Sequence, residues 1–381
     1  MYLKRRDFLK LMPVSILAPK QLVNNHSFTA RNDPAAIPFQ SGTRHTQDSS
    51  EIDKLYKNAI VIDALIIARD WDEDWLKAVE QSGYTGLQTS LSSGNLTAAL
   101  NDLDRWDKRI QDNPDKLIKA VTAADIERAK REGKLAMMFG FQNATMIGNR
   151  IDNLQKLYDS GTRWIQLTYN TRNLLGDGCT ERTNAGLSDF GVAAVERMNE
   201  LGIIVDLSHC GRQTTMDGIQ FSDPGPCFTH TMCESLYPDH PRSKTDEQIK
   251  AMADKGGVMG IIGLGYMIGP DPGGETTIET HADHIDHAVK VAGIDHVGLA
   301  SDFSIHGISP GATRENWYVP RLTSFKPSYQ VRWPPWLPGL ESPERYKNVA
   351  HVLDRRGYRS EHIEKILGLN WLRYYRDVLR T

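Results

Sequence analysis

The chain has 381 residues, of which 40% are hydrophobic and 24% are charged, and its formal net charge at pH 7 is -3. These values are ordinary for a globular protein with a large core. The small net charge gives no electrostatic reason to bind nucleic acid or an anionic membrane surface, so we expect neither as a partner. Its four cysteines form no CxxC pair, and their spacing does not establish a disulfide.

The N-terminus has the pattern of an export signal. Residues Lys4–Lys10 contain a twin arginine followed by Phe-Leu-Lys, which is typical of the Tat pathway. The weakly apolar stretch that follows, Leu11–Ala18, is too short to span a bilayer, and we expect no transmembrane segment. A basic N-terminal tail is the alternative interpretation. The pattern predicts a periplasmic or otherwise Tat-exported protein with three segments, namely a signal at residues 1–20, a polar linker at 21–50 and a folded domain at 51–381.

From residue 51 onward, short apolar runs alternate with segments of helical period. The apolar runs are Ala59–Ala64, Gly86–Leu91, Leu135–Phe141, Trp164–Tyr169, Ile203–Ser208, Cys227–His230, Val258–Ile262 and Val297–Ser301. The helical segments include Leu96–Asn113, Ala123–Arg131, Ile151–Ser160, Asp189–Leu201, Asp246–Lys255 and Ser360–Leu379. This alternation favours an α/β fold of the (β/α)8 TIM-barrel type. A doubly wound open sheet is the alternative, although no GxGxxG follows the first run.

Two neighbouring runs each lead to a histidine. The fifth run is followed by His209, the sixth ends on His230, and a segment of helical length, Arg212–Phe221, joins them. A strand, helix, strand unit implies parallel strands with a right-handed crossover, so both imidazoles should lie at one rim. Imidazole is the commonest protein ligand of transition metals, which makes the pair a candidate metal site. Two ordinary hydrogen-bonded histidines are the alternative.

Other polar side chains follow the strands at the same rim, where barrel enzymes carry their catalytic residues. Asp302, after the eighth run, is a candidate to take a proton from an attacking water and return it to the leaving group. A helix cap or an ion pair is its alternative role. Arg242, after the sixth run, is a candidate to hold a substrate carboxylate through two parallel hydrogen bonds, or else an exposed loop arginine.

The segment Gly307–Leu340 departs from the alternating pattern because it is rich in Pro, Trp and Tyr. It follows the last predicted strand, so a long loop should lie at the rim that carries the histidines. Long loops without regular structure are often functional, and the aromatic residues suggest a lid or a substrate wall. An irregular loop packed on the barrel or at a subunit contact is the alternative.

Several stretches resemble the membrane (renal) dipeptidases of the amidohydrolase superfamily. The best are residues 161–168 (GTRWIQLT), 184–191 (NAGLSDFG), 205–209 (VDLSH), 239–242 (DHPR) and 296–303 (HVGLASDF). The resemblance covers roughly Ala59 to Arg373 and implies a (β/α)8 barrel that cleaves dipeptides at a binuclear zinc site. By position, His209 and His230 match the histidines of the second zinc. Asp302 matches the catalytic aspartate, and Arg242 matches the arginine that holds the substrate carboxylate.

Four positions depart from the family's pattern. Leu65 and Ile67 stand where a His-x-Asp binds the first zinc, and hydrocarbon side chains cannot bind a metal. Gln142 replaces the glutamate that bridges the two metals, and Tyr169 replaces a histidine that contacts substrate. The resemblance therefore implies at most one metal, expected to be zinc, held by the two histidines and Gln142, with Tyr169 and Arg242 at the substrate.

Two functions remain open at this point. An exported metal-dependent hydrolase would cleave a dipeptide or a related small amide by metal-activated water, with one metal rather than two. A dipeptidase-like protein without peptidase activity would instead bind or modify a peptide-derived metabolite, and it would need no metal. A small molecule or dipeptide is the expected partner in both cases, and a homodimer is consistent with the sequence.

Overall fold

The computed structural model describes residues 49–68, 71–72, 74–238, 240–271 and 274–380. The predicted export signal and almost all of the predicted linker lie outside the described residues. Within the described ranges, no helix is long and apolar enough to cross a membrane.

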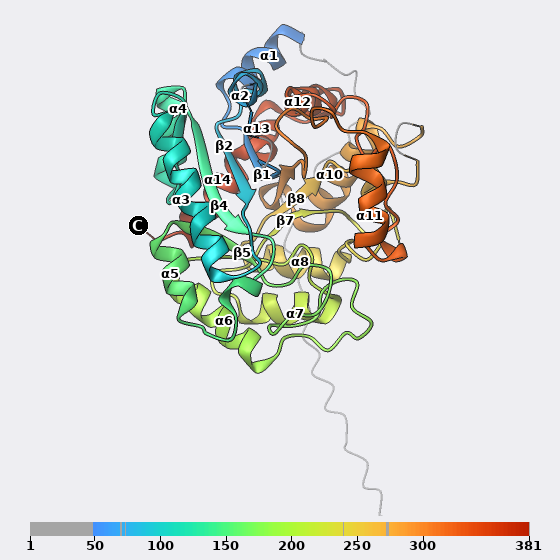
Figure 1. The fold of residues 1–381 in the computed structure, drawn as a ribbon. Coiled ribbons are helices and arrows are strands. Elements are labelled where there is room, and N and C mark those ends of the chain that lie inside the picture. Colours follow the sequence, from blue (N-terminus) through green and yellow to red (C-terminus); the bar gives the residue numbers. More distant parts are fainter. Residues whose placement is uncertain (1–48, 69–70, 73, 239, 272–273, 381) are drawn as a thin grey trace, which may run out of the picture. The chain divides into compact units, whose positions relative to one another are not determined.

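In the described part of the chain the strands form two sheets, and all neighbouring strands are parallel (Figure 1). The first sheet has the order β1-β2-β4-β5-β6, with β3 paired to β4, and the second has the order β7-β8-β9. The bounds are β1 Ile62–Ile66, β2 Gly86–Ser90, β3 Leu117–Lys119, β4 Leu135–Phe141, β5 Thr162–Gln166, β6 Ile204–Asp206, β7 Phe228–Thr231, β8 Met259–Ile262 and β9 Val297–Ala300. Nearly all strand residues are buried, as expected for a parallel sheet covered on both faces.

Backbone hydrogen bonds join the two sheets at both ends. At the β6–β7 seam, the Cys227 amide donates to the Val205 carbonyl at 2.9 Å. At the β9–β1 seam, the Asp302 amide donates to the Leu65 carbonyl at 2.9 Å. The predicted α/β fold is confirmed. Its mostly parallel sheet curls into a half-barrel. The complete eight-stranded barrel stays a prediction.

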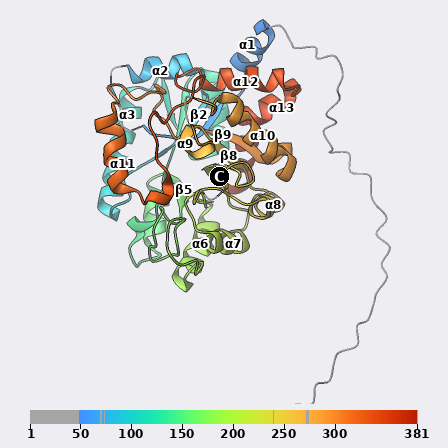
Figure 2. The same cartoon turned by 90° about the vertical axis from the view of Figure 1, so that its right-hand side faces the viewer.

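Helices surround the strands, with α6 and α7 on one side and α2 and α12 on the opposite side (Figure 2). The bounds are α1 Ser49–Asn58, α2 Trp75–Ser82, α3 Leu96–Asp112, α4 Ala123–Glu132, α5 Asn153–Asp159, α6 Asp189–Leu201, α7 Arg212–Phe221, α8 Asp246–Asp254, α9 Gly265–Ile268, α10 Ile278–Ala292, α11 Val319–Ser324, α12 Arg345–Arg355, α13 Ser360–Glu364 and α14 Asn370–Val378. Local sequence fixes several ends. The Ser188 side chain caps α6, and Thr245 and Gln248 form a capping box that begins α8.

Two details differ from the sequence-based expectations, and the state of the cysteines, which the sequence left open, is resolved. Strand β3 was not predicted, because three residues are too short for a recognisable pattern. The predicted C-terminal helix Ser360–Leu379 is interrupted at Gly368, where the backbone packs so closely on the Ile60 carbonyl that a Cβ atom would clash. All four cysteines are free thiols.

A buried carboxylate lies at each seam between the sheets. Asp206 accepts four hydrogen bonds, from the amide and hydroxyl of Ser208 and from the amide and hydroxyl of Thr229, at 2.6–3.0 Å. Asp63 accepts from the amides of Leu65 and Ser301 at 3.2 and 2.9 Å. Burial raises the pKa of both carboxyl groups, and these hydrogen bonds oppose the shift. Asp206 therefore ties the end of β6 to β7, and Asp63 ties β1 to the residue that follows β9.

Asp206→Asn should lower the free energy of unfolding by about 2 to 4 kcal/mol, because an amide cannot accept all four hydrogen bonds and leaves buried donors unsatisfied. Urea unfolding followed by circular dichroism measures the change. The matched control is Asp254→Asn, which removes a carboxylate from an exposed pair with Lys250 and should change stability little. Equal stability of the two variants would show that Asp206 does not hold the seam.

Candidate functional site

A cavity of about 1240 Å³ lies at the carboxyl ends of the strands. Ser90 at the end of β2, Gln142 after β4 and Asp302 after β9 all line it. Another wall comes from the segment Gly307–Leu340, which contributes the aromatic side chains Trp317, Phe325, Tyr329 and Trp336. The predicted position of this segment at the rim is therefore confirmed, and its role as a lid or a substrate wall stays a prediction.

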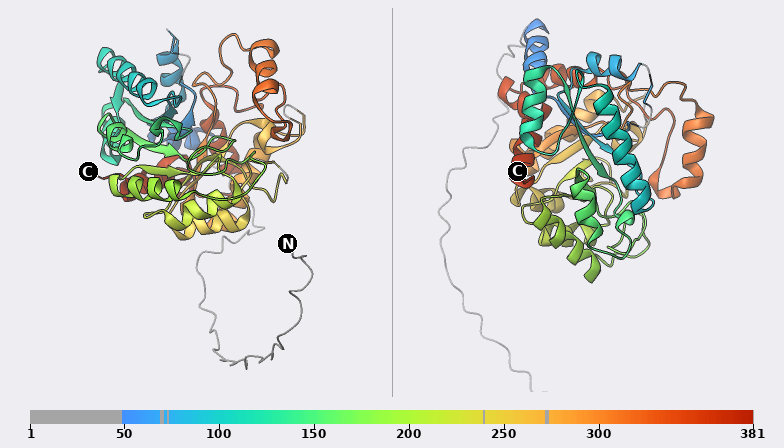
Figure 3. Two further views of the ribbon diagram at one scale, coloured as in Figure 1. Left: turned by 60° about the horizontal axis from the view of Figure 1, so that its bottom comes forward. Right: turned by 60° about the vertical axis from the view of Figure 1, so that its left-hand side comes forward.

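The prediction that Gly307–Leu340 lacks regular structure is wrong in part. It contains a single π-helical turn, Arg314–Tyr318, that runs directly into α11. Thr313 begins this helix because its hydroxyl accepts from the Asn316 amide at 3.3 Å while the Asn316 side chain accepts from the Thr313 amide at 2.7 Å. Figure 3 shows α11 standing outside the helices that pack on the sheets. The segment is an arm with a helical centre.

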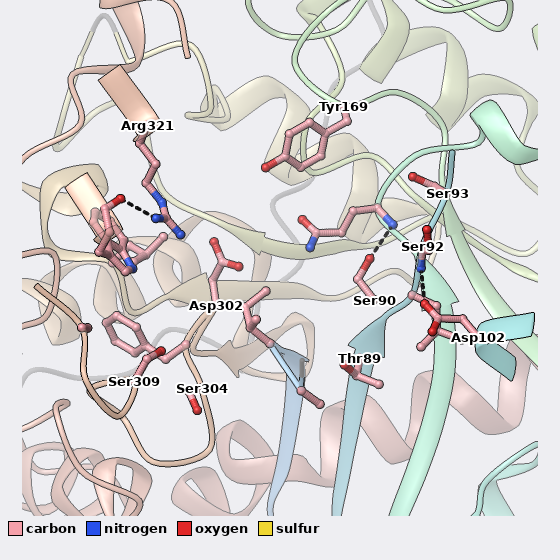
Figure 4. Close-up of a pocket in the computed structure, with 18 of the residues that line it drawn as sticks. Thr89, Ser90, Ser92, Ser93, Asp102, Tyr169, Asp302, Ser304, Ser309 and Arg321 are labelled. Atoms are coloured by element: carbon pink, nitrogen blue, oxygen red, sulfur yellow. Dashed lines mark hydrogen bonds between the residues drawn. The ribbon is translucent and has the colours of Figure 1, made fainter. Parts of the chain in front are cut away.

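Asp302 and Tyr169 point into the same part of the pocket together with Arg321 (Figure 4). Asp302 has a φ of 55°, in the left-handed region that non-glycine residues seldom adopt. Such backbone conformations are held by the surrounding structure and cluster at functional sites. The structure thus places the predicted catalytic carboxylate in the cavity, where it can exchange a proton with a bound molecule.

The structure brings His209 and His230 together. Their Nε2 atoms lie 2.9 Å apart, and both side chains are buried, with exposures of 1% and 0%. Neither histidine lines the cavity. Burial, reinforced by the positive charge of Arg242, lowers the pKa of both imidazoles well below the ordinary value of 6.5. Both rings are therefore neutral at pH 7.

The Nδ1 atoms of the pair are held by fixed acceptors. Nδ1 of His209 lies 2.7 Å from the Asn170 side-chain oxygen, and Nδ1 of His230 lies 2.7 Å from the Thr229 hydroxyl, whose proton goes to Asp206. Both partners favour a proton on Nδ1. Two such tautomers would leave two Nε2 lone pairs facing each other at 2.9 Å, which is unfavourable unless a cation lies between them. The donor set therefore fits one metal ion.

The other predicted metal ligands are weaker candidates. Gln142 lines the cavity, and its backbone amide donates to the Ser90 hydroxyl at 3.1 Å. The predicted role of its side-chain oxygen as a third ligand stays a prediction. Leu65 is fully buried and Ile67 lines the cavity, and the replacement of the first metal's ligands by these two hydrocarbon side chains stays a prediction. Among the described residues, no group of three or more His, Cys, Asp or Glu side chains has the geometry to hold a metal.

Tyr169 connects the cavity to the histidine pair. Its ring stacks on His209 with a centroid distance of 4.2 Å and an interplanar angle of 22°, and its other side lines the cavity. Tyr169 therefore lies against both His209 and the cavity.

Arg242 is fully buried rather than exposed, and it does not line the cavity. Its guanidinium donates to the carbonyls of Ser208 and His230 at 3.1 and 2.6 Å and to the Tyr329 hydroxyl at 2.8 Å. These bonds join the ends of β6 and β7 to the arm. The predicted contact of Arg242 with a substrate carboxylate stays a prediction.

Sequence reasoning did not identify Arg321, which lines the cavity from α11. Its guanidinium carbon lies 3.8 Å from the centroid of the Trp317 ring. The available signal was the spacing of four residues between Trp317 and Arg321, which places the two side chains on one face of a helix.

The chain is similar to known proteins of one family. Residues 68–324 match the family model described as membrane dipeptidase, peptidase family M19. Dipeptidase tcpJ of Claviceps purpurea is 27% identical over 307 residues, which are 80% of this chain and 65% of that relative. The chain spans between 57% and 65% of the length of this and two further curated dipeptidases that it matches.

Solved structures show the same likeness. An amidohydrolase from Pseudomonas aeruginosa is 31% identical with a TM-score of 0.76, covering 86% of this chain and 99% of that one. A metallo peptidase from Rhodobacter sphaeroides, solved with a phosphinate mimic of the dipeptide L-Ala-D-Ala, is 18% identical with a TM-score of 0.68, covering 84% and 99%. The second structure shares the fold.

The neutral state of the histidine pair has a measurable pH dependence. The unfolded chain binds protons at both imidazoles below about pH 6.5, whereas the folded chain does not. The stability that these neutral rings contribute is thus complete above about pH 6.5 and is lost as the pH falls. Nitrogen-15 NMR of chelator-treated protein, assigned with His209→Gln and His230→Gln, should show both rings still neutral at a pH below about 6.5, where unfolded imidazoles are protonated. Titration of either folded ring near its unfolded value would contradict this interpretation.

Proposed function

The chain belongs to the membrane dipeptidase family, peptidase family M19, and we propose that it hydrolyses a dipeptide or a related small amide with one bound metal, expected to be zinc. Family membership supports a dipeptidase-like hydrolase. The binding of a single metal is supported by the two facing Nε2 atoms, which lie 2.9 Å apart, while acceptors hold both Nδ1 atoms. The replacement of the first-metal ligands by Leu65 and Ile67 argues against a second ion.

His209 and His230 would hold the metal, with the Gln142 side-chain oxygen as a candidate third ligand. A metal at this position would polarise an amide carbonyl and lower the pKa of a water molecule. Hydrogen bonds from Nδ1 orient both rings, and the Asp206 carboxylate acts on His230 through the Thr229 hydroxyl. With neutral ligands, we expect weaker metal binding than at a site that contains a carboxylate.

Residues that line the cavity would transfer the protons and enclose the substrate. The Asp302 carboxylate takes a proton from the attacking water and gives it to the amine nitrogen of the leaving group, so that it ends the reaction ionised as it began. The aromatic wall limits the access of bulk water to the scissile amide. Tyr169 covers His209 and must lie beside any amide that reaches the pair.

A second function is favoured by one specific observation. The two histidines lie outside the lining of the cavity, and no cluster of three ionisable ligands exists among the described residues. A dipeptidase-like protein without peptidase activity would bind or modify a peptide-derived metabolite in the cavity and use the histidine pair as a hydrogen-bonded element of the core. Turnover and metal content together separate this function from hydrolysis.

Three further proposals concern the whole protein. The twin arginine at Arg5 and Arg6 supports export by the Tat pathway to the periplasm. The backbone bonds at both seams support one closed eight-stranded barrel. A homodimer is the third proposal, and it rests only on the family resemblance.

Hydrolysis of alanyl-alanine by zinc-loaded protein should fall by about 100-fold or more in Asp302→Asn and should be lost in His209→Ala. Elemental analysis should find about one equivalent of metal in the wild type and in Asp302→Asn, and none in His209→Ala. His351→Ala is the matched control, because His351 forms a surface pair with Asp53. Absence of turnover in the wild type would favour the second function, and full activity of Asp302→Asn would exclude it as the proton carrier.

A further inference from the structure

The arm presents large aromatic side chains to the cavity. Trp317, Phe325 and Trp336 line the cavity and are only half-buried, whereas Tyr329 on the same wall is 3% exposed. Rings of this size usually lie inside a protein, because covering their apolar surface is favourable. Three half-buried rings on one cavity wall therefore form a surface that a ligand with an apolar group would cover.

The cavity is larger than two small residues require. Its volume of about 1240 Å³ exceeds the range of about 300 to 1000 Å³ that is usual for pockets that enclose drug-sized ligands. A dipeptide such as alanyl-alanine is smaller than such ligands and would leave much of the cavity to water. Space for a larger substituent therefore exists beside the scissile amide.

The aromatic wall and the charged lining lie on different sides of Asp302. Figure 4 shows Arg321 on the arm and Asp102 on α3 at opposite sides of the pocket, with Asp302 between them. Polar side chains from α3 and the loop before it line the far side beside the buried Trp106, namely Ser92, Ser93, Asp102, Arg105 and Arg109. A substrate whose amide lies at Asp302 can therefore place an apolar group against the arm and direct its polar parts elsewhere.

Contacts within the arm hold the rings in place before a ligand binds. Trp336 packs edge-on against Trp317 with a centroid distance of 6.4 Å, and Phe325 stacks on Tyr329 at 4.7 Å. The Arg321 guanidinium covers one face of Trp317 at 3.8 Å. Aromatic pairs prefer offset or edge-to-face contacts, and both arrangements already occur within this wall. Rings held in this way lose little conformational freedom when a further ring packs on them.

Most of this wall lies beyond the part of the chain that matches the dipeptidase family. The match ends at residue 324, within the arm, so Phe325, Tyr329 and Trp336 follow it. The wall can therefore give this chain a substrate preference that family membership does not predict.

We propose that Trp317, Phe325 and Trp336 form a subsite for a large aromatic group, so that the site prefers a dipeptide or small amide that carries such a group over one with two small aliphatic side chains. This inference deepens the proposed function and rests on it for the identity of the amide. Binding of the aromatic group does not require turnover, so the two proposals can fail separately. The three residues would be specificity-determining residues carried by the arm.

Isothermal titration calorimetry tests the proposal with three probes, alanyl-alanine, tryptophyl-alanine and alanyl-tryptophan. The parent of every sample is the full chain with Asp302→Asn, supplied with zinc, so that any hydrolysis is suppressed. At least one tryptophan probe should bind the parent about 10-fold or more tightly than alanyl-alanine. Trp317→Ala and Trp336→Ala should each reduce this preference by about 3- to 10-fold and should change the binding of alanyl-alanine by less than about 3-fold. Trp317→Leu should give an intermediate loss, because it keeps an apolar side chain but not the ring.

Tyr318→Ala is the matched control. Tyr318 lies in the same helical turn as Trp317 and stacks with Arg314 at 5.0 Å, but it does not line the cavity. The control should keep the full preference. No preference in the parent, a preference that both tryptophan variants keep, or equal losses for all three probes would each overturn the proposal. A preference that depends on Trp317 and Trp336, found without turnover in the wild type, would keep the proposal and contradict only the hydrolase function.

Discussion

Two buried carboxylates determine where the functional side chains lie. Asp206, at the end of β6, accepts two hydrogen bonds from Thr229 of β7 and two from Ser208 beyond its own strand. Asp63, in β1, accepts one from Ser301 after β9 and one from Leu65 in its own strand. Hydrogen-bond donors, and at Asp63 also the Arg345 guanidinium 3.8 Å away, stabilise these buried charges, so each aspartate favours one arrangement of its two strands. The β6–β7 seam places the two histidines face to face. The β9–β1 seam places Asp302 in the cavity beside the hydrocarbon of Ile67.

The charged side chains near the histidine pair have opposite effects on the binding of a cation. Arg242 and Lys244 are both buried beside the pair, and their positive charges disfavour a cation there. The Asp206 carboxylate acts in the other direction through the Thr229 hydroxyl and His230. Burial lowers the pKa of Lys244 to about 8, so its charge weakens at mildly alkaline pH. Metal affinity should therefore depend on this balance as well as on the ligands.

Much of the fold follows from the sequence because buried parallel strands are continuous apolar runs. Each of the eight predicted runs overlaps a strand, and Arg212–Phe221 matches α7. The pairing of His209 and His230 was predictable from the strand, helix, strand order alone. The burial of Arg242 and the cavity position of Arg321 were not, because both depend on how the arm folds back over the strand ends. The stacking of Tyr169 on His209 depends on the same long-range packing.

We propose that the histidine pair is the retained half of a two-metal site and binds one cation. A crystal of the full chain grown with zinc would locate that cation by anomalous scattering. We expect one peak, at about 2.0 to 2.1 Å from Nε2 of both His209 and His230, and none beside Leu65 and Ile67. A map without a peak at the pair, with the two Nε2 atoms still within hydrogen-bonding distance, would contradict it.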